Sequence, residues 1–205
     1  MRTLKMFPTS INSEYLDIAV NALRDGEPII YPTDTLYAIG CDALNNRAIE
    51  NICRIKSIDP RRHFLSVVCA DISQAAIYAR IDNRAFAILK RYLPGPYTFI
   101  LPAATTLPKV FKSRRQVGIR IPDDNIATAL ASALGNPLLS STADWADSDD
   151  DVLFPEAVAD HFKDSGINLI IDKGECQSTL PSTIVDLTDS TSPIIIREGK
   201  GDFEI

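Results

Sequence analysis

Apolar residues at helical spacing alternate along the chain with short apolar runs. The first helical stretch consists of Leu16, Ala19, Val20 and Leu23. Asn12 or Ser13 can cap this helix, and Gly26 lies where it would end. The same spacing predicts helices that start near residues 45–46, after 71, after 82, at 123–124 and at 155. The core-facing residues expected in the helix after residue 82 are Phe86, Leu89 and Leu93.

Short β-prone runs between these helices predict strands. They cover residues 28–31, 64–69, 97–101, 117–121, 137–140, 168–172, 183–187 and 193–197. Strands and helices alternate for most of the chain, which favours an α/β fold, and the strand-rich end favours a mixed sheet. We therefore predict one domain over residues 1–205, built on a twisted mixed β-sheet flanked by helices. The acidic and serine-rich run 147–151 is expected to be a solvated loop.

The most informative stretch is residues 29–42, where two apolar runs bracket a polar corner. Pro32 has no amide donor and biases Tyr31 toward extended geometry. Thr33, Asp34 and Thr35 follow, and their side chains can cap their own backbone or bind a ligand. The corner is a candidate ligand-binding edge.

Composition narrows the class of protein. The 205 residues are 45% hydrophobic and 23% charged, as in globular domains. We find no apolar run long enough for a membrane span and no signal peptide, so we expect a cytoplasmic protein with no membrane partner. The net charge of −6 argues against nucleic-acid binding through the whole surface. The dispersed cysteines at 41, 53, 69 and 176 favour reduced, buried thiols.

Familiar catalytic patterns are absent from the sequence. It contains no phosphate-loop motif and no dinucleotide-binding glycine motif. His63 and His161 lack the spacing of metal ligands or of a nucleophile's base, so we predict no metal site. His161, on an amphipathic helix, is expected to be a surface histidine or one whose hydrogen bonds are satisfied.

Hydroxyl groups recur instead where predicted strands end. They belong to Thr33, Thr35, Ser140, Thr142, Ser182 and Thr183. Arg120 and Arg197 lie within apolar strands, where a cation is costly unless it meets an anion. Each feature alone has an ordinary explanation: hydroxyls cap turns, and Arg120 could pair with Asp34 or Asp186. Together they predict a concave, donor-lined site for a phosphate or carboxylate.

Four motifs are spread along the chain: Tyr31-Pro32-Thr33-Asp34-Thr35-x-Tyr37-x-x-Gly40-Cys41-Asp42; Pro94-Gly95-Pro96-x-Thr98; Arg120-x-Pro122 with Pro137-Leu138-x-Ser140; and Pro181-Ser182-Thr183-x-x-Asp186 followed by Arg197-x-Gly199. In order and spacing they resemble the YrdC/YciO family of threonylcarbamoyl-adenylate synthases. The resemblance implies a YrdC-like fold with a basic concave cavity. It also implies a nucleotidyltransferase that uses ATP, L-threonine and bicarbonate, with Mg²⁺, to form threonylcarbamoyl-AMP for tRNA modification.

By position, the resemblance assigns candidate roles to several residues. The threonine-binding candidates are Thr35, Arg120, Thr142 and Ser182, and the nucleotide-binding candidates are Lys56, Ser140 and Arg197. Lys56 and Arg120 are the catalytic candidates, because this chemistry needs no protein nucleophile but needs cations beside the phosphates.

The sequence also departs from the synthase pattern. Ile58 stands where synthases carry an arginine, and Asp144 stands where they carry an asparagine, which is closest to the YciO branch. The alternative is therefore a weakly active or non-catalytic paralogue that binds nucleotide, tRNA or double-stranded RNA. The RNA-binding candidates are Arg54, Arg61, Arg62, Arg114 and Arg115.

Overall fold

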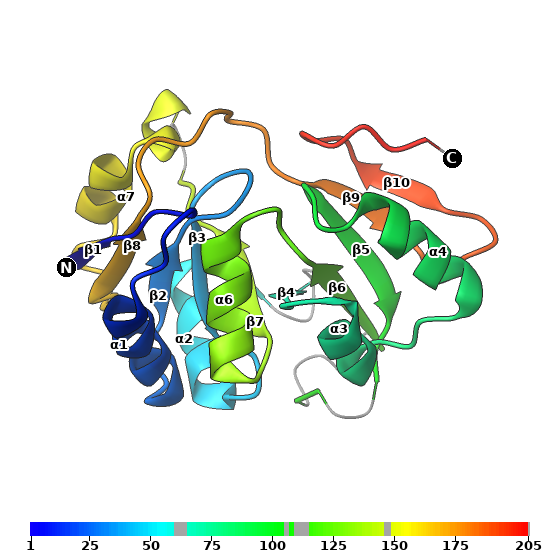
Figure 1. Cartoon of the computed structure of the whole chain (residues 1–205), viewed down its shortest axis with the longest axis horizontal. Helices are drawn as coiled ribbons and strands as arrows, with labels where there is room; N and C mark the ends of the chain where they lie inside the picture. The colour runs from blue at the N-terminus through cyan, green and yellow to red at the C-terminus, as the bar shows by residue number, and fades with distance from the viewer. Residues whose placement is uncertain (60–64, 105–106, 109–114, 146–148, 205) are drawn as a thin grey trace.

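The computed structural model describes residues 1–59, 65–104, 107–108, 115–145 and 149–204. In these residues a ten-stranded sheet has the order β1-β8-β2-β3-β7-β4-β6-β5-β9-β10 (Figure 1). Four neighbouring strand pairs are parallel, β1/β8, β2/β8, β4/β6 and β5/β9, and the others are antiparallel. The predicted mixed sheet is confirmed.

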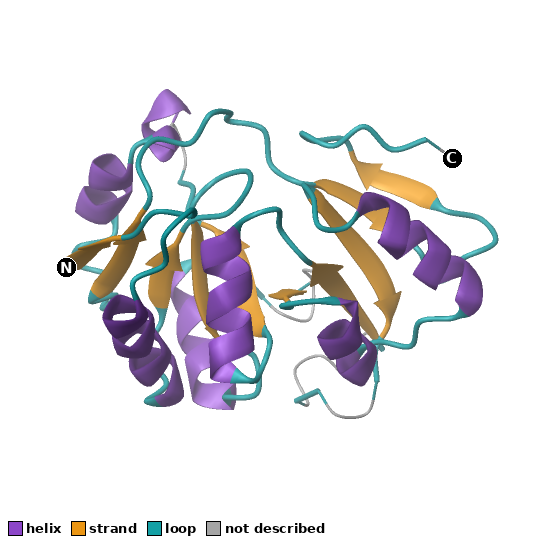
Figure 2. Cartoon of the chain, viewed as in Figure 1, coloured by secondary structure: helices purple, strands orange, loops and turns teal. Residues whose placement is uncertain are grey.

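The strands are β1 Arg2–Lys5, β2 Ile29–Tyr31, β3 Ala38–Asp42, β4 Ser66–Val68, β5 Tyr97–Pro102, β6 Gln116–Arg120, β7 Leu138–Thr142, β8 Leu169–Asp172, β9 Thr183–Asp186 and β10 Ile194–Arg197. The helices are α1 Ser13–Arg24, α2 Asn46–Ile55, α3 Ile72–Tyr78, α4 Asn83–Tyr92, α6 Asn125–Leu134, α7 Pro155–His161 and the short 3-10 helix η1 Asp149–Leu153. Figure 2 shows how the helices flank the strands. None of the helices in the described ranges is long and apolar enough to cross a bilayer.

The predicted caps start and stop the helices. Asn12 and Asn45 each accept a hydrogen bond from a backbone amide in the first turn of α1 and α2. Asp124 accepts two amides at the start of α6, and Gly135, with φ of +79°, ends that helix. Local sequence therefore determines where these helices begin and end.

Two details of the prediction are wrong. Phe86 is 48% exposed, because α4 buries Ala85 and Leu89, four residues apart, and Phe86 lies off that stripe. The run 147–151 is not simply a loop: its residues from 149 onward belong to η1, which buries Val152. The prediction also missed β1, an edge strand in which Leu4 is buried between more exposed residues.

The core forms a separate layer on each face of the sheet. Helices α2, α3, α4 and α7 pack on one face. Helices α1 and α6 pack on the other. Adjacent residues of β4 divide between the layers, Val67 in the first and Val68 in the second, as alternation along a strand requires. The four cysteines are free and buried, as predicted.

A row of small residues crosses the middle of the sheet. Gly40, Ser140, Ser66 and Gly118 are paired in register across β3, β7, β4 and β6. A Cβ atom at Gly118 would lie 2.6 Å from Ser66 Oγ. This part of the sheet therefore has little room for larger side chains, and its surface lies close to the backbone.

Candidate functional site

The polar corner, residues 32–37, connects β2 to β3, and Arg120 at the end of β6 reaches into it. Nη2 of Arg120 lies 2.6 Å from Asp34 Oδ1, 3.0 Å from Thr33 Oγ1 and 2.8 Å from Thr35 Oγ1. The Arg120 and Asp34 side chains are only 10% and 7% exposed. The buried cation thus meets an internal carboxylate, which was one of the two explanations open from the sequence.

Arg120 retains an unsatisfied donor. Within the described part of the chain, its Nε is buried and has no hydrogen-bond partner. Buried polar atoms are nearly always paired, so a buried donor without a partner requires an explanation. The Arg120 guanidinium combines structural contacts with unused hydrogen-bonding capacity.

Two lysines that sequence reasoning missed hold the backbone of the corner. Lys173 Nζ donates to the Thr33 carbonyl oxygen at 2.5 Å and pairs with Asp124 at 2.6 Å. Lys200 Nζ donates to the Asp34 carbonyl oxygen at 2.6 Å. Neither lysine lies in a recognisable motif, and the corner carbonyl oxygens to which they donate are more than a hundred residues away in the sequence.

These lysines come from segments that pass the corner from elsewhere in the fold. Lys173 opens the long connection from β8 to β9, which crosses between the two ends of the sheet (Figure 1). Lys200 belongs to the tail after β10. With the corner, Lys173, Lys200 and Cys176 line a cavity of about 380 Å³. Burial raises the pKa of the Cys176 thiol.

Ser182 and Arg197 meet at the start of β9. Arg197 Nη2 donates to the Ser182 carbonyl oxygen at 2.7 Å, and Ser182 Oγ lies 3.0 Å from Thr98 Oγ1. Burial lowers the pKa of the Arg197 guanidinium; the charge of Arg120 lowers it further, and the Asp144 carboxylate opposes both effects. Arg197 therefore lies within electrostatic reach of both Arg120 and Asp144.

Lys56, directly after α2, is paired with Asp144. Its Nζ lies 2.6 Å from Asp144 Oδ1 and 2.5 Å from the Asp144 carbonyl oxygen. The Lys56 side chain is 13% exposed and that of Asp144 is 55% exposed. The neighbouring Ser57 has φ of +52°, in the left-handed region, where it turns the chain out of α2. The positive charge of the Lys56 ammonium is thus partly neutralised by the Asp144 carboxylate.

The remaining candidates on β7 differ in how they are held. Ser140 accepts a hydrogen bond of 2.8 Å from the Tyr31 hydroxyl, whose pKa burial raises to about 12. Thr142, half-buried, pairs in register with Ala38 beside the corner. In the structure Arg120 contacts Thr35, and Arg197 contacts Ser182. Lys56 instead lines a second cavity, of about 470 Å³.

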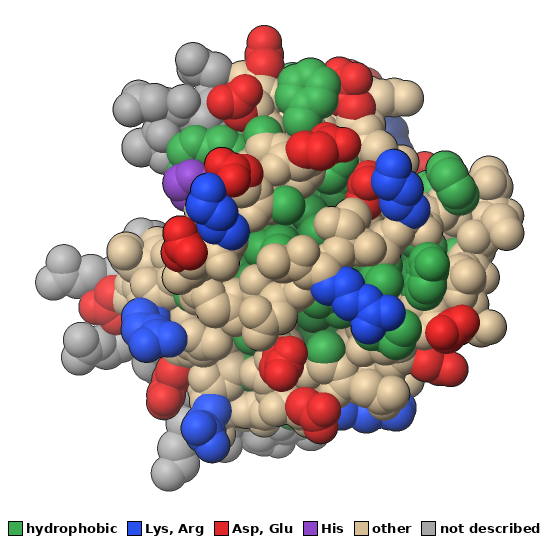
Figure 3. Space-filling view, turned by 90° about the vertical axis from the view of Figure 1, so that its left-hand side faces the viewer, with side chains coloured by type: hydrophobic (Ala, Val, Ile, Leu, Met, Phe, Trp, Pro, Cys, Tyr) green, Lys and Arg blue, Asp and Glu red, His purple; other side chains and the backbone are tan. Residues whose placement is uncertain are grey.

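The predicted RNA-binding residues are only partly described. Arg61, Arg62 and Arg114 lie outside the described residues. Arg54 is exposed and donates to Asn51 on its own helix, and Arg115 is exposed with φ of +54°. On the face shown in Figure 3, acidic and basic side chains are interspersed. That face does not form a continuous basic surface.

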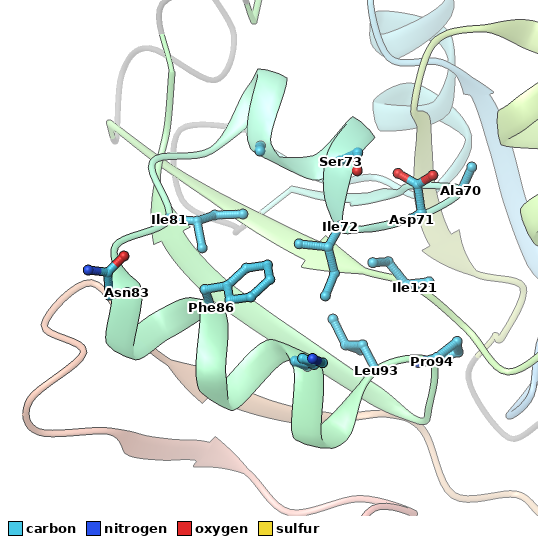
Figure 4. Close-up of a pocket in the computed structure, with 12 residues that line it drawn as sticks. Ala70, Asp71, Ile72, Ser73, Ile81, Asn83, Phe86, Leu93, Pro94 and Ile121 are labelled. Carbon is cyan, nitrogen blue, oxygen red and sulfur yellow. The ribbon is translucent and has the colours of Figure 1, made fainter.

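A further cavity of about 650 Å³ lies between α3 and α4, and its lining is mainly apolar. Ile72, Phe86 and Leu93 point into it (Figure 4), which explains why Phe86 is exposed. The corner, Lys56 and Arg120 do not line this cavity. In the described ranges, no three His, Cys, Asp or Glu residues are grouped as metal ligands.

Comparisons with known proteins give a consistent result. The family Sua5_yciO_yrdC, described as telomere recombination, matches residues 21–199. The protein called "Uncharacterized protein YciO" of Escherichia coli is 38% identical over 199 residues, 96% of this chain and 95% of that protein. The crystal structure of E. coli YciO superposes with a TM-score of 0.87 over 98% of this chain and 97% of that one.

Other relatives have names or titles that state an activity or a ligand. A threonylcarbamoyl-AMP synthase of Chromobacterium violaceum is 35% identical over 167 residues, 80% of this chain and 84% of that protein. The structure of Pyrococcus abyssi Sua5 complexed with L-threonine is 28% identical, with a TM-score of 0.87. It aligns with 97% of this chain but 58% of Sua5, so this chain spans little more than half of that relative.

Proposed function

Because the chain belongs to the Sua5/YciO/YrdC family, we propose that it forms threonylcarbamoyl-AMP from ATP, L-threonine and bicarbonate. The observation that carries this proposal is the donor-lined junction in which the Arg120 guanidinium contacts Thr33, Asp34 and Thr35 of the corner. The synthase name of the C. violaceum relative and the L-threonine complexed with P. abyssi Sua5 support it. The product would supply tRNA threonylcarbamoyladenosine modification.

The amino-acid side of the site would be formed by Thr35, Arg120, Thr142 and Ser182. Arg120 would bind the threonine carboxylate. After a small rotation of the guanidinium, a carboxylate oxygen would accept the hydrogen bond from Arg120 Nε, which otherwise has no partner among the described residues. Hydroxyls at Thr35 and Ser182 are buried near the guanidinium groups and can donate to the carboxylate or accept from the amine.

The reaction needs positioning more than protein nucleophiles. The threonine amine adds to carbon dioxide derived from bicarbonate and loses a proton, which forms an N–C bond and a carbamate. A carbamate oxygen then attacks the α-phosphorus of ATP, and the bond to the β-phosphate oxygen breaks to release pyrophosphate. Lys56 and Arg197 would stabilise the phosphate charge, with Ser140 as a hydroxyl donor.

Magnesium fits this proposal through Asp144. Mg²⁺ in nucleotide sites is commonly held by one or two carboxylates together with substrate phosphates. Asp144 is a 55% exposed carboxylate beside Lys56, so it can serve as such a ligand without a dedicated protein cage. When bound, the ion would neutralise phosphate charge.

The test is threonine-dependent release of pyrophosphate. The protein is incubated with ATP, bicarbonate and Mg²⁺, with and without L-threonine, and the product is identified by mass spectrometry. Lys56→Ala should reduce the rate, whereas Lys163→Ala, which removes an exposed lysine paired with Asp160, should not. Pyrophosphate release that does not depend on threonine would contradict the proposal.

The second candidate is a nucleotide- or RNA-binding paralogue with little turnover. The Lys56–Asp144 pair favours it, because the carboxylate reduces the charge available to a triphosphate. If the chain is such a paralogue, it should bind tRNA or double-stranded RNA with an affinity that falls as the salt concentration rises. Binding that persists after Arg61, Arg62, Arg114 and Arg115 are all replaced by alanine would count against it.

A further inference from the structure

An aromatic stack lies beside Lys56, on residues to which the sequence assigned no role. The rings of Trp145 and His161 are nearly parallel, 8° apart, with centroids 4.2 Å apart. Phe162 lies edge-on to both, at 6.2 Å from Trp145 and 4.7 Å from His161. Phe162 is buried, whereas Trp145 is half-buried and His161 is exposed. A buried ring thus supports a flat stack that reaches the surface.

The stack forms part of a cavity with polar groups. Trp145, His161 and Phe162 line the 470 Å³ cavity together with Lys56 and Asp144. Lys56 Nζ lies 5.9 Å from the centroid of the Phe162 ring, within the range of a cation–π contact. Figure 3 shows a histidine exposed on this side of the molecule beside hydrophobic, basic and acidic side chains. The cavity therefore combines a flat aromatic wall, a cation and an exposed carboxylate.

This combination matches the parts of a nucleotide. Nucleobases stack on aromatic side chains through their π faces. A carboxylate such as Asp144 can hold a Mg²⁺ ion that accompanies the phosphates. An ammonium at the same site suits the phosphates that follow the ribose. A ligand without an aromatic ring could not extend the ring stack, and a ligand without phosphates would not use the Lys56 ammonium.

We propose that the Trp145–His161 stack is a nucleobase subsite that binds the purine of a nucleotide as a third stacked ring. The phosphates extend past Lys56 toward Arg197, and Asp144, which is paired with Lys56, lies at the phosphate end of the subsite. The assignment rests on the proposed function for the identity of the nucleotide, ATP. Base binding itself does not require turnover.

Trp145 makes the subsite directly measurable, because it is the only tryptophan in the sequence. Adenosine and AMP are titrated while its fluorescence is recorded, with pyrophosphate and ribose 5-phosphate at equal ionic strength as base-free probes. We expect saturable quenching by adenosine and AMP and no comparable change with the base-free probes. Equal responses to AMP and ribose 5-phosphate, or none to adenosine, would overturn the proposal.

Two variants test the stack itself. His161→Ala keeps the fluorophore and should weaken AMP binding roughly tenfold, as expected for loss of a base–aromatic stack. Lys163→Ala, an exposed change two residues away, should leave it unchanged. Circular dichroism checks folding, and unaltered AMP affinity in folded His161→Ala counts against the proposal. If His161→Ala does not fold, the comparison of adenosine with ribose 5-phosphate on the unmodified protein decides.

The result separates this inference from the proposed function. Normal threonine-dependent pyrophosphate release without adenosine binding at Trp145 would refute the subsite and retain the synthase. Adenosine binding at Trp145 without pyrophosphate release would retain the subsite and refute the synthase.

Discussion

The Lys56–Asp144 pair makes a quantitative prediction about nucleotide affinity. Asp144→Asn removes one negative charge beside Lys56 but leaves the Asp144 backbone carbonyl, which already accepts a hydrogen bond of 2.5 Å from Lys56 Nζ. The new amide oxygen can also accept from Lys56. The lysine should therefore keep its position while its charge becomes available to an anion.

The expected gain follows from the charge removed. The charge removed is that of the Asp144 carboxylate, which would repel an ATP phosphate bound at Lys56. For unit charges about 6 Å apart at an effective dielectric constant of about 40, that repulsion is about 1.4 kcal/mol. That corresponds to about a tenfold change in affinity. Because the Asp144 side chain is 55% exposed, solvent and salt reduce the effect, and we expect a gain of about three- to tenfold for ATP. Stability should fall by about 0–1 kcal/mol, the usual range for such a pair.

Isothermal titration calorimetry with ATP at two salt concentrations measures this effect. The measurement is made without Mg²⁺, because Asp144 is the proposed metal ligand. Glu204→Gln is the matched control: it makes the same charge change at an exposed pair with Arg91, in which the Arg91 and Glu204 side chains are 64% and 82% exposed. Higher salt should reduce the gain in Asp144→Asn.

The reasoning is refuted if Asp144→Asn binds ATP no better than the unmodified protein. It is also refuted if Glu204→Gln gives an equal gain, because the effect would then be one of net charge. Weaker binding by Asp144→Asn would mean that Asp144 orients Lys56 rather than neutralising it.

Three other changes test the frame of the site. Ser57→Gly should raise the free energy of unfolding by about 0.5–1 kcal/mol, since φ of +52° costs serine more than glycine; an unchanged thermal midpoint would contradict this. Gly199→Ala should weaken threonine binding measured by calorimetry, because its Cβ would collide with the backbone that carries Ser182; unaltered binding would show that this loop adjusts. Burial raises the pKa of Tyr31 from 10.0 to about 12, so its contribution to stability is present below pH 10 and is lost as pH rises toward 12. Tyr31→Phe should lower the free energy of unfolding near pH 7 by about 1 kcal/mol, because the hydrogen bond to Ser140 is lost. In urea titrations between about pH 9 and about pH 12, the variant should also lose less stability than the unmodified protein. An equal loss in both proteins would assign the decline to other groups.

The sequence predicted the elements whose signals are local. Asn12, Asn45 and Gly135 start or stop helices through hydrogen bonds and backbone angles set within a few residues. Phe86 was misplaced, because helical spacing does not show which of two adjacent apolar residues borders a groove. Side-chain environment depends on neighbours from distant parts of the chain.

The candidate site was predictable in composition but not in pairing. Arg120 within an apolar strand indicated an anion partner, yet the sequence left Asp34 and Asp186 equally open. Lys173 and Lys200 gave no signal, because backbone carbonyls accept hydrogen bonds from any donor that the fold brings near. Motifs identify side chains that meet ligands, and they do not identify those that hold the backbone.

The two corner lysines have a consequence for how such a site can change. Both donate to the main chain, Lys173 at residue 33 and Lys200 at residue 34, so their hold does not depend on which side chains the corner carries. A substitution at the side chain of Asp34 therefore leaves both lysine contacts in place, because the carbonyl oxygens at residues 33 and 34 are present in any residue.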